Sequence, residues 1–220
     1  MATETTIEDY LKAVWNATEW SDAPVTVTML STRLGLSPSS VSEIVRKLTD
    51  RGLLTHPRYG SVTLTDDGRA IALATVRKHR LIETFLVEYL GYEWDEVHDE
   101  AEVLEHAVSD EFVERLAQRL GQPTHDPHGD PIPGPDGVLP AEERTELAGV
   151  EDGSRVRVAR VSDEDPVLLR HLRDVGVELG VTVEVVAQRA AAGTVDVSIA
   201  GEKVTLGLPA ARAILTEPIG

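Results

Sequence analysis

Hydrophobic positions in the first part of the chain repeat with the three- to four-residue period of helices. The first apolar stripe consists of Ile7, Leu11, Val14 and Trp15. Thr5 and Glu8 have the spacing of a capping box, so we expect a helix to begin there. A short second helix is expected over residues 29–34, and Gly35 ends it.

The next segment has the pattern of a helix followed by a β-hairpin. Ser37 is expected to be the N-cap of this third helix, with Pro38 at the first helical position. The buried face of the helix comprises Val41, Ile44, Val45 and Leu48. Gly52 stops the helix, and two short strands are expected at residues 53–54 and 62–64. This order of elements predicts a winged helix-turn-helix.

Longer helices are predicted in the middle of the chain. One starts near Thr65 and Asp66 and runs to about Leu90, a second begins near Trp94 or Asp95 and continues past His106, and a third covers about 110–120. Residues 122–140 are dense in proline and glycine, so they form either a linker or an ordered loop.

The last third of the chain changes to the two-residue period of half-buried strands. The alternating apolar positions are Val156, Val158, Val181, Val183, Val185, Val195, Val197 and Ile199. One helix is expected over residues 166–175, closed by Gly176. The fold class is therefore mainly α with a small, barrel-like β domain at the C-terminal end.

Composition narrows the range of functions. The 220 residues carry a formal net charge of −17 and include no cysteine, which excludes disulfides and thiolate metal ligands and favours the cytoplasm. The N-terminus lacks the pattern of a secretory signal, and no apolar stretch is long enough for a bilayer, so no membrane association is expected. The acidic balance argues against indiscriminate DNA binding, and it suggests that bound cations assist any DNA affinity.

The third helix is the candidate for reading DNA. Its outer face is small and polar, which lets the backbone approach base edges in the major groove. An ordinary three-helix packing unit is the alternative, but it does not explain why four basic residues gather here, namely Arg46, Lys47, Arg51 and Arg58. The expected DNA contacts are Thr28, Ser37, Pro38, Ser39, Ser40, Ser42, Glu43, Arg46, Lys47, Arg58 and Tyr59.

A second set of residues has the pattern of a metal site. Glu102, Glu105 and His106 have the i, i+3, i+4 spacing that places side chains on one helix face. Two carboxylates and an imidazole on one patch are typical of a divalent-metal site, although a solvated acidic face is the alternative. The preceding helix repeats the i, i+4 spacing with His79 and Glu83. Further ligand types occur at Asp9, His98, Asp126 and His128.

Three segments, RKHRLIETFL, VHDEAEVLEHAVSDE and HGDPIPG, together resemble the diphtheria toxin repressor family. The resemblance covers almost the whole chain. It implies a winged helix-turn-helix DNA-binding domain at 1–70, a helical metal-binding and dimerisation domain with a Pro-rich loop at 71–140, and an SH3-like domain at 141–220. It also implies a homodimer that binds an inverted-repeat operator in double-stranded DNA when loaded with Fe(II) or Mn(II).

The same resemblance implies a primary metal site made of Asp9, Glu102, Glu105 and His106. Iron-sensing members of the family present a Met and a Cys at the positions of Asp9 and Glu102. This chain therefore resembles the manganese-sensing members, because Mn(II) is a hard cation that suits carboxylate oxygen. Fe(II) and Co(II) are the alternative ions.

An ancillary site is implied at His79, Glu83 and His98, with a further ligand from the C-terminal domain. Within the segment SDEDP, we favour Asp165 for that ligand. In other manganese sensors the His79 position belongs to a binuclear primary site. One such sensor has a Glu where this chain has Lys12, which argues against the binuclear arrangement.

The loop supplies two more candidate ligands. Some manganese-sensing members use a Cys and a His there, and Asp126 and His128 occupy those positions in this chain. The sequence thus predicts a repressor of metal-homeostasis genes that is activated by Mn(II) and is not an enzyme. Two other functions stay open: a winged-helix regulator that responds to iron or to an organic ligand, and a carboxylate-site metalloenzyme. The enzyme would need an open coordination position and a general base.

Overall fold

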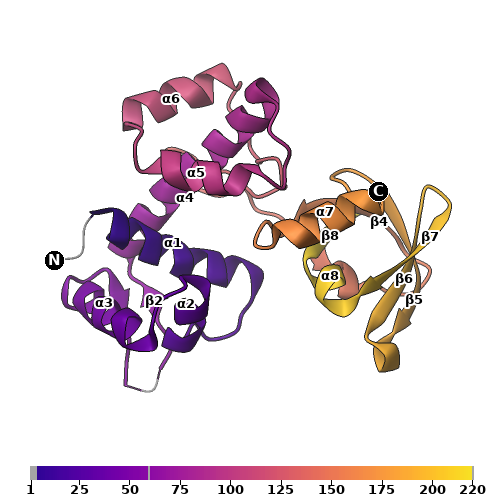
Figure 1. Ribbon diagram of the computed structural model, residues 1–220, viewed down its shortest axis with the longest axis horizontal. Helices are drawn as coiled ribbons and strands as arrows, with labels where there is room; N and C mark the ends of the chain where they lie inside the picture. The colour runs from indigo at the N-terminus through magenta and orange to yellow at the C-terminus, as the bar shows by residue number, and fades with distance from the viewer. Residues whose placement is uncertain (1–3, 59, 220) are drawn as a thin grey trace. The chain divides into compact units, whose positions relative to one another are not determined.

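The computed structural model describes residues 4–58 and 60–219 (Figure 1). The chain packs as two compact units, Met1–His79 with Pro133–Val138, and Arg80–Ile132 with Leu139–Gly220. The boundary between them falls inside a helix, so the domain limits at residues 70 and 140 stay a prediction. Among the described residues, no helix is both long and apolar enough to cross a membrane.

The first unit contains a helix-turn-helix and a hairpin. Its elements are α1 (Glu4–Trp20), α2 (Val27–Arg33), α3 (Pro38–Asp50), β1 (Leu54–Thr55), β2 (Thr63–Leu64) and the beginning of α4 (Asp66–Leu90). Apolar side chains from these elements are fully buried, among them Leu11, Val14, Leu30, Val41 and Val45, and so is Val62 just before β2. The periodicity of the sequence therefore predicts most of this core correctly, although Ile44 is only partly buried.

Local capping explains where these helices start and stop. The Ser37 hydroxyl accepts a hydrogen bond from the Ser40 amide at 3.2 Å, and Pro38 is the first residue of α3, as predicted. Gly35 and Gly52 have φ angles of +64° and +74°, a conformation that glycine adopts without strain. The capping box at Thr5 is wrong, because α1 already includes Glu4 and Thr5 lies inside the helix.

The hairpin is antiparallel and pairs Leu54 with Leu64. The residues that follow it start α4, where the Thr65 hydroxyl accepts the Gly68 amide at 3.1 Å. Gly68 has no room for a side chain, since a Cβ there would lie 2.0 Å from the Leu53 carbonyl oxygen. The first turn of α4 is thereby held close to the hairpin.

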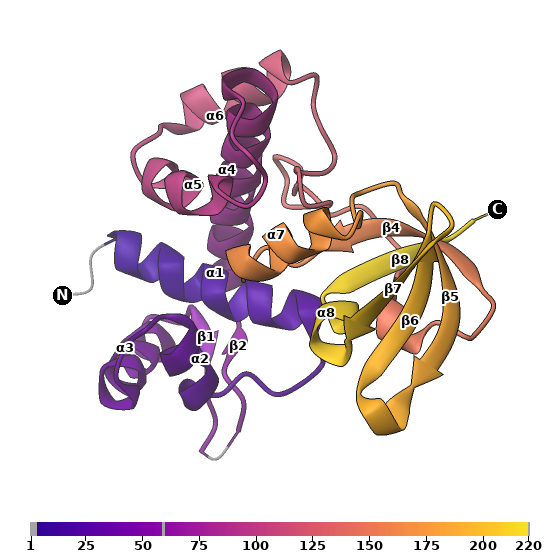
Figure 2. The same cartoon turned by 45° about the vertical axis from the view of Figure 1, so that its right-hand side comes forward.

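The second unit begins with a helical segment. The rest of α4 packs with α5 (Val97–Glu105) and α6 (Asp110–Arg119), which lie beside it in both views (Figures 1 and 2). The shared core includes Leu81, Ile82, Leu86, Val97, Ala101, Val113, Leu116 and Ala117.

The prediction that the helix of α5 starts near Trp94 and continues past His106 is wrong at both ends. The helix begins at Val97, and His106 is its C-cap. The amides of Ala107 and Val108 both bond to the Leu104 carbonyl, which closes the last turn. The chain then turns because Ser109 caps α6 by accepting the Phe112 amide.

The C-terminal part of the second unit is one six-stranded antiparallel sheet. Its order is β3-β8-β4-β5-β6-β7. The bounds are β3 (Thr145–Glu146), η1 (Leu147–Gly149), β4 (Arg155–Val161), α7 (Pro166–Asp174), β5 (Thr182–Arg189), η2 (Ala190–Ala192), β6 (Thr194–Ile199), β7 (Glu202–Gly207), α8 (Leu208–Arg212) and β8 (Ile214–Pro218). The alternating valines point into one core, to which α7 adds Leu169 and Leu172.

The Pro- and Gly-rich stretch is an ordered loop over residues 126–133, rather than a linker. Residues 128–133 are all buried, and an isolated bridge pairs His125 with Pro131. Gly129 lies against β4, because a Cβ there would be 2.1 Å from the Ala159 carbonyl oxygen. This loop therefore brings Asp126 and His128 into the interior of the second unit.

Candidate metal centre

The C-terminal end of α5 presents one carboxylate and one imidazole next to each other. Glu105 is buried at 1% exposure, because Val97 and Ala101 on the same side of α5 pack into the helical core. The His106 Nε2 atom lies 3.4 Å from a Glu105 carboxylate oxygen. Ligand atoms of Glu102, Glu105 and His106 all lie within 4.8 Å of one another. The helical spacing thus places these three residues on one patch, as the sequence predicts.

Asp9, the fourth residue of the predicted primary set, belongs to the first unit. It lies in the second turn of α1 and is partly buried. The described helix begins at Glu4, so Asp9 is two residues further along it than the capping box at Thr5 implies. Its membership of the primary site remains a prediction.

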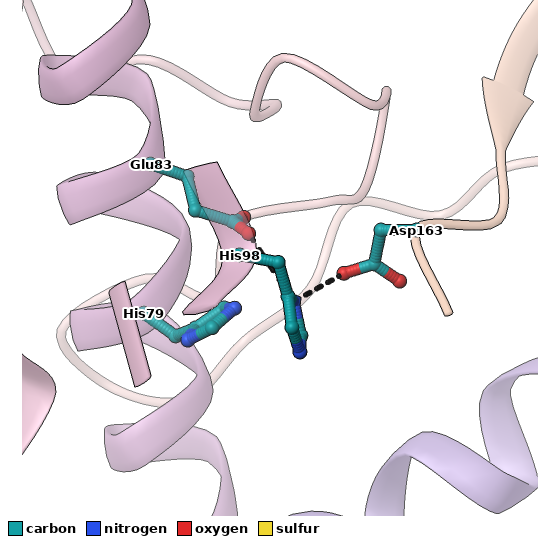
Figure 3. Close-up of side chains that lie close together, drawn as sticks. All are labelled: His79, Glu83, His98 and Asp163. Atoms are coloured by element: carbon teal, nitrogen blue, oxygen red, sulfur yellow. Dashed lines mark ion pairs between the residues drawn. The ribbon is translucent and has the colours of Figure 1, made fainter. Parts of the chain in front are cut away.

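A second cluster assembles around Glu83 from parts of the chain that are far apart in sequence (Figure 3). The Glu83 side chain is fully buried, and one of its oxygens lies 3.5 Å from His98 Nδ1. Asp163, from the connection between β4 and α7, lies 3.1 Å from the same nitrogen. His79 stands one turn before Glu83 on the continuous helix α4, and its ring is directed toward the same group.

Charge within this cluster is balanced between acids and histidine. Burial disfavours the imidazolium form of His98, but the hydrogen bonds that its ring donates to the carboxylates of Asp163 and Glu83 outweigh this effect and raise the pKa of His98 to about 11. Burial opposes ionisation of Asp163, yet the hydrogen bond from His98 holds the pKa of that carboxyl below its usual range. A proton on His98 therefore supplies the positive charge that these carboxylates face.

Asp165 is not part of this cluster, which corrects the position favoured within SDEDP. Its carboxylate caps α7, where it accepts the amides of Val167 at 2.8 Å and Leu168 at 3.3 Å. Asp163 stands two residues earlier, before the helix begins, and its side chain reaches His98. The local sequence does not show which acid of this segment reaches the cluster. The packing of β4 and α7 decides it.

His128 approaches Glu83 from the loop. Its ring is fully buried and stacks on Trp94 with 6.1 Å between the ring centroids. Its Nε2 donates to the Trp94 carbonyl oxygen at 2.6 Å, which leaves Nδ1 facing the second Glu83 oxygen at 3.9 Å. Burial lowers the pKa of His128, but the negative charges of Glu83 and Asp126 raise it. The net effect is a rise of the His128 pKa to about 9.

Asp126 shapes the loop as well as facing the cluster. One of its oxygens accepts the amides of His128 at 2.8 Å and Asp130 at 2.9 Å. The other faces Arg80 at 3.8 Å. Burial and the nearby charges of Asp130 and Glu83 raise the pKa of Asp126. Asp126 therefore closes the loop through its hydrogen bonds. It also offers a carboxylate oxygen close to the ligand atoms of Glu83 and His128.

The loop is fastened between α4 and the β domain by residues that the sequence reading missed. Arg80 on α4 pairs with Asp130 at 3.3 Å and donates to the Pro131 carbonyl at 2.7 Å. Arg160 on β4 pairs with the same Asp130, and the Val161 amide donates to the His128 carbonyl at 2.9 Å. Buried arginines carry no periodic signature, so no pattern in the sequence marks these contacts.

Both sets of donors fit a hard divalent cation. Each combines carboxylate oxygens with imidazole nitrogen, and the chain offers no thiolate. The four atoms offered by His79, Glu83, His98 and Asp163 lie within 4.8 Å of one another, as do those of Glu83, Asp126 and His128. These separations are short enough for one ion to be shared by each group.

The outer face of α3 is exposed, as a DNA-reading helix requires. The Ser37 hydroxyl lies 2.9 Å from the hydroxyls of Ser39 and Ser40, so these short side chains stay close to the helix. All predicted contacts within the described residues lie at the surface apart from Lys47, which is half-buried. Tyr59 lies outside the described residues.

Three family models match the chain in succession. They are described as "Iron dependent repressor, N-terminal DNA binding domain" over residues 2–62, "Iron dependent repressor, metal binding and dimerisation domain" over 65–134, and "FeoA domain" over 145–218. Together with the elements described above, they confirm the predicted fold class: a winged helix-turn-helix, a helical dimerisation segment and an SH3-like β domain.

Relatives with iron and with manganese in their names are similar to the chain. It is 35% identical to the iron-dependent repressor IdeR of Mycobacterium leprae, over 97% of each chain. A solved structure named as a manganese-dependent transcriptional repressor in complex with manganese is 51% identical, with a TM-score of 0.93 over 97% of this chain and 100% of that one. The apo form of the manganese-activated repressor ScaR is 36% identical, with a TM-score of 0.84 over 96% and 100%.

Proposed function

We propose, from the premise that the chain belongs to the diphtheria toxin repressor family of metal-dependent transcriptional repressors, that manganese(II) is the ion that activates it. The protein is a metal-dependent transcriptional repressor, and its metal is the open question. The observation that carries the proposal is the oxygen-rich donor set on α5. The family resemblance implies that Glu102 stands where the iron sensors have a cysteine. Identity of 51% to a manganese-dependent repressor, against 35% to an iron-dependent one, supports it.

Asp9, Glu102, Glu105 and His106 form the primary site of this proposal. Three carboxylates brought together repel one another, and a bound divalent ion supplies the charge that offsets this repulsion. Asp9 belongs to the DNA-binding domain, whereas Glu102, Glu105 and His106 belong to the dimerisation domain. An ion bound by residues of both domains restrains the position of each α3 relative to the α3 of the other protomer. Operator affinity depends on that position, because the two helices must match the spacing of the half-sites.

The cluster around Glu83 is the ancillary site. His79, Glu83, His98 and Asp163 are its ligands, with Asp126 and His128 as donors on the other side of Glu83. These residues come from α4, α5, the loop and the β domain. A metal ion bound here therefore stabilises the packing of α5 against these segments. Fe(II) and Co(II) remain the alternative ions for both sites.

Exposed apolar residues support a homodimer. Four large hydrophobic side chains are exposed on the helical segment of the second unit: Tyr89, Leu90, Val103 and Phe112. Exposed apolar side chains on helices that match a dimerisation domain are expected to contact a second copy of the chain. A dimer presents two α3 helices, and it is expected to bind an inverted-repeat DNA site.

Metal preference tests the proposal. An operator is first selected from a random DNA library with the Mn(II)-loaded protein, and its affinity is then measured with Mn(II), Fe(II) under anaerobic conditions, Co(II) or chelator. We expect tight binding with Mn(II) and weak binding with chelator. The double variant Asp9→Met/Glu102→Cys should lose about tenfold or more of the Mn(II) response relative to Fe(II) and Co(II), because it installs softer ligands.

Glu100→Gln is the matched control, since Glu100 is an exposed acid on the same helix. It should keep the wild-type ranking of metals. If the double variant also keeps that ranking, Asp9 and Glu102 are not ligands and the proposal of manganese fails.

A further inference from the structure

The outer face of α3 carries one carboxylate in its N-terminal half. Val41, Val45 and Leu48 are buried, so the opposite side of the helix faces outward. Ser39 and Glu43 stand there one turn apart, and both are exposed. The N-terminal residues of a recognition helix are those that contact base edges, so Glu43 occupies a reading position.

Glu43 is held as an exposed, ionised side chain. Its carboxylate lies 2.7 Å from the Lys47 ammonium one turn further along, and 58% of the side chain remains exposed. The hydrogen bond from Lys47 and its positive charge hold the pKa of Glu43 below its ordinary value. The neighbours Ser39 and Ser42 are short, so they leave room for the carboxylate to reach the floor of a groove.

A carboxylate in this position is selective because DNA offers it few partners. Phosphates repel it, and the protein already has a net charge of −17. In the major groove guanine presents two acceptors, and thymine presents an acceptor and a methyl group. Adenine presents an amino group next to the N7 acceptor, whereas cytosine presents its N4 amino group with no acceptor of its own beside it.

We propose that Glu43 determines operator specificity by accepting a hydrogen bond from the N4 amino group of a cytosine, once in each half-site. The inference rests on the proposed function, since it requires that α3 enter the major groove. Lys47 offsets the repulsion between the Glu43 carboxylate and the DNA backbone. The alternative role for Glu43 is an ion pair that stabilises the helix, which predicts no preference for any base.

Selection of operators by two variants tests the assignment. Wild-type protein, Glu43→Gln and Asp50→Asn are each loaded with Mn(II) and used to enrich binding sites from one random DNA library. Asp50 is the matched control, because it is an exposed acid two turns further along the same face and is paired with Arg46 at 3.6 Å. Both substitutions remove one negative charge and should raise affinity for all sequences to a similar, salt-dependent degree.

Only Glu43→Gln should change the enriched sequence. At one symmetric pair of positions cytosine should lose its preference and adenine should gain, by about tenfold, because glutamine pairs with adenine N6 and N7. The same enriched sequence from wild type and Glu43→Gln, or the same change from Asp50→Asn, overturns the assignment. If the wild-type protein enriches no palindromic site with Mn(II), the proposed function fails and the assignment fails with it.

Discussion

The face of α5 and the cluster around Glu83 bring acidic and histidine side chains together in two different ways. Glu102, Glu105 and His106 stand within five consecutive residues at the end of one helix. The Glu83 cluster draws on α4, α5, the loop and the β4–α7 connection. Glu83 at its centre is fully buried, whereas His98 and Asp163 are partly exposed. One set is brought together by a single helix, whereas the other forms only when segments far apart in the sequence pack together.

The two sets also differ in how their charge is balanced. In the Glu83 cluster, protonated His98 and His128 face Glu83 and Asp163 in the metal-free protein. Metal binding at such a cluster displaces protons, because a histidine ligand must be neutral. The α5 set places the carboxylates of Glu102 and Glu105 close together at a helix end. Its charge balance therefore depends more on the bound ion. We therefore expect the α5 set to switch the protein and the Glu83 cluster to tune it.

The largest expected effect follows from removing the imidazole of the α5 set. His106→Ala should lower the apparent Mn(II) affinity for activation of operator binding by about 100-fold or more, since second-shell losses alone reach that size. Mn(II) titrations monitored by operator binding measure it. Glu100→Gln should behave as wild type, and full activation of His106→Ala by ordinary Mn(II) levels would contradict the comparison.

Acidity should act mainly on the Glu83 cluster. The pKa values of His98 and His128 lie near 11 and 9, above the ordinary value of 6.5, so both are protonated at neutral pH and must release protons to bind metal. Mn(II) affinity at this cluster should rise by about tenfold per pH unit for each proton released. Calorimetric titrations between pH 7 and 8, in buffers of different ionisation enthalpy, count those protons. His128→Asn should release fewer.

The same shifts give a sign for the stability of the metal-free protein. A pKa raised in the folded state stabilises the fold below the unfolded value, and the contribution is lost as pH rises through the folded value. His128 should therefore stabilise the metal-free fold below about pH 6.5 and lose that contribution by about pH 9. Urea unfolding with chelator present, for wild type and His128→Asn, checks it: their difference should shrink as pH rises.

The smallest expected effect separates the two sets most directly. His79→Ala should weaken activation by Mn(II) only severalfold, because His79 is one of several donors in this cluster. The experiment is the same Mn(II) titration as for His106→Ala, run side by side. If His79→Ala is the more damaging change, His79 belongs to the switching site and the binuclear arrangement gains support.

Local sequence determines much of this protein. The cap at Ser37, the stop at Gly52 and the alternating valines of the β domain all follow from interactions between near neighbours, and the structure places them as predicted. The patch of Glu102, Glu105 and His106 belongs to the same class, because a spacing of three and four residues fixes a helix face. The helix predicted to continue past His106 shows the limit, because the chain turns there into α6, whose N-cap is Ser109.

Only the tertiary structure decided the rest. Asp163 rather than Asp165 reaches His98, because Asp165 is held by the first amides of α7. The orientation of His128 depends on the Trp94 carbonyl, which comes from a segment 34 residues away. The spacing of residues along the chain predicts which side chains lie together only within one regular helix or strand. Between α4, the loop and β4 the geometry is set by buried packing and by the pairs of Arg80 and Arg160 with Asp130.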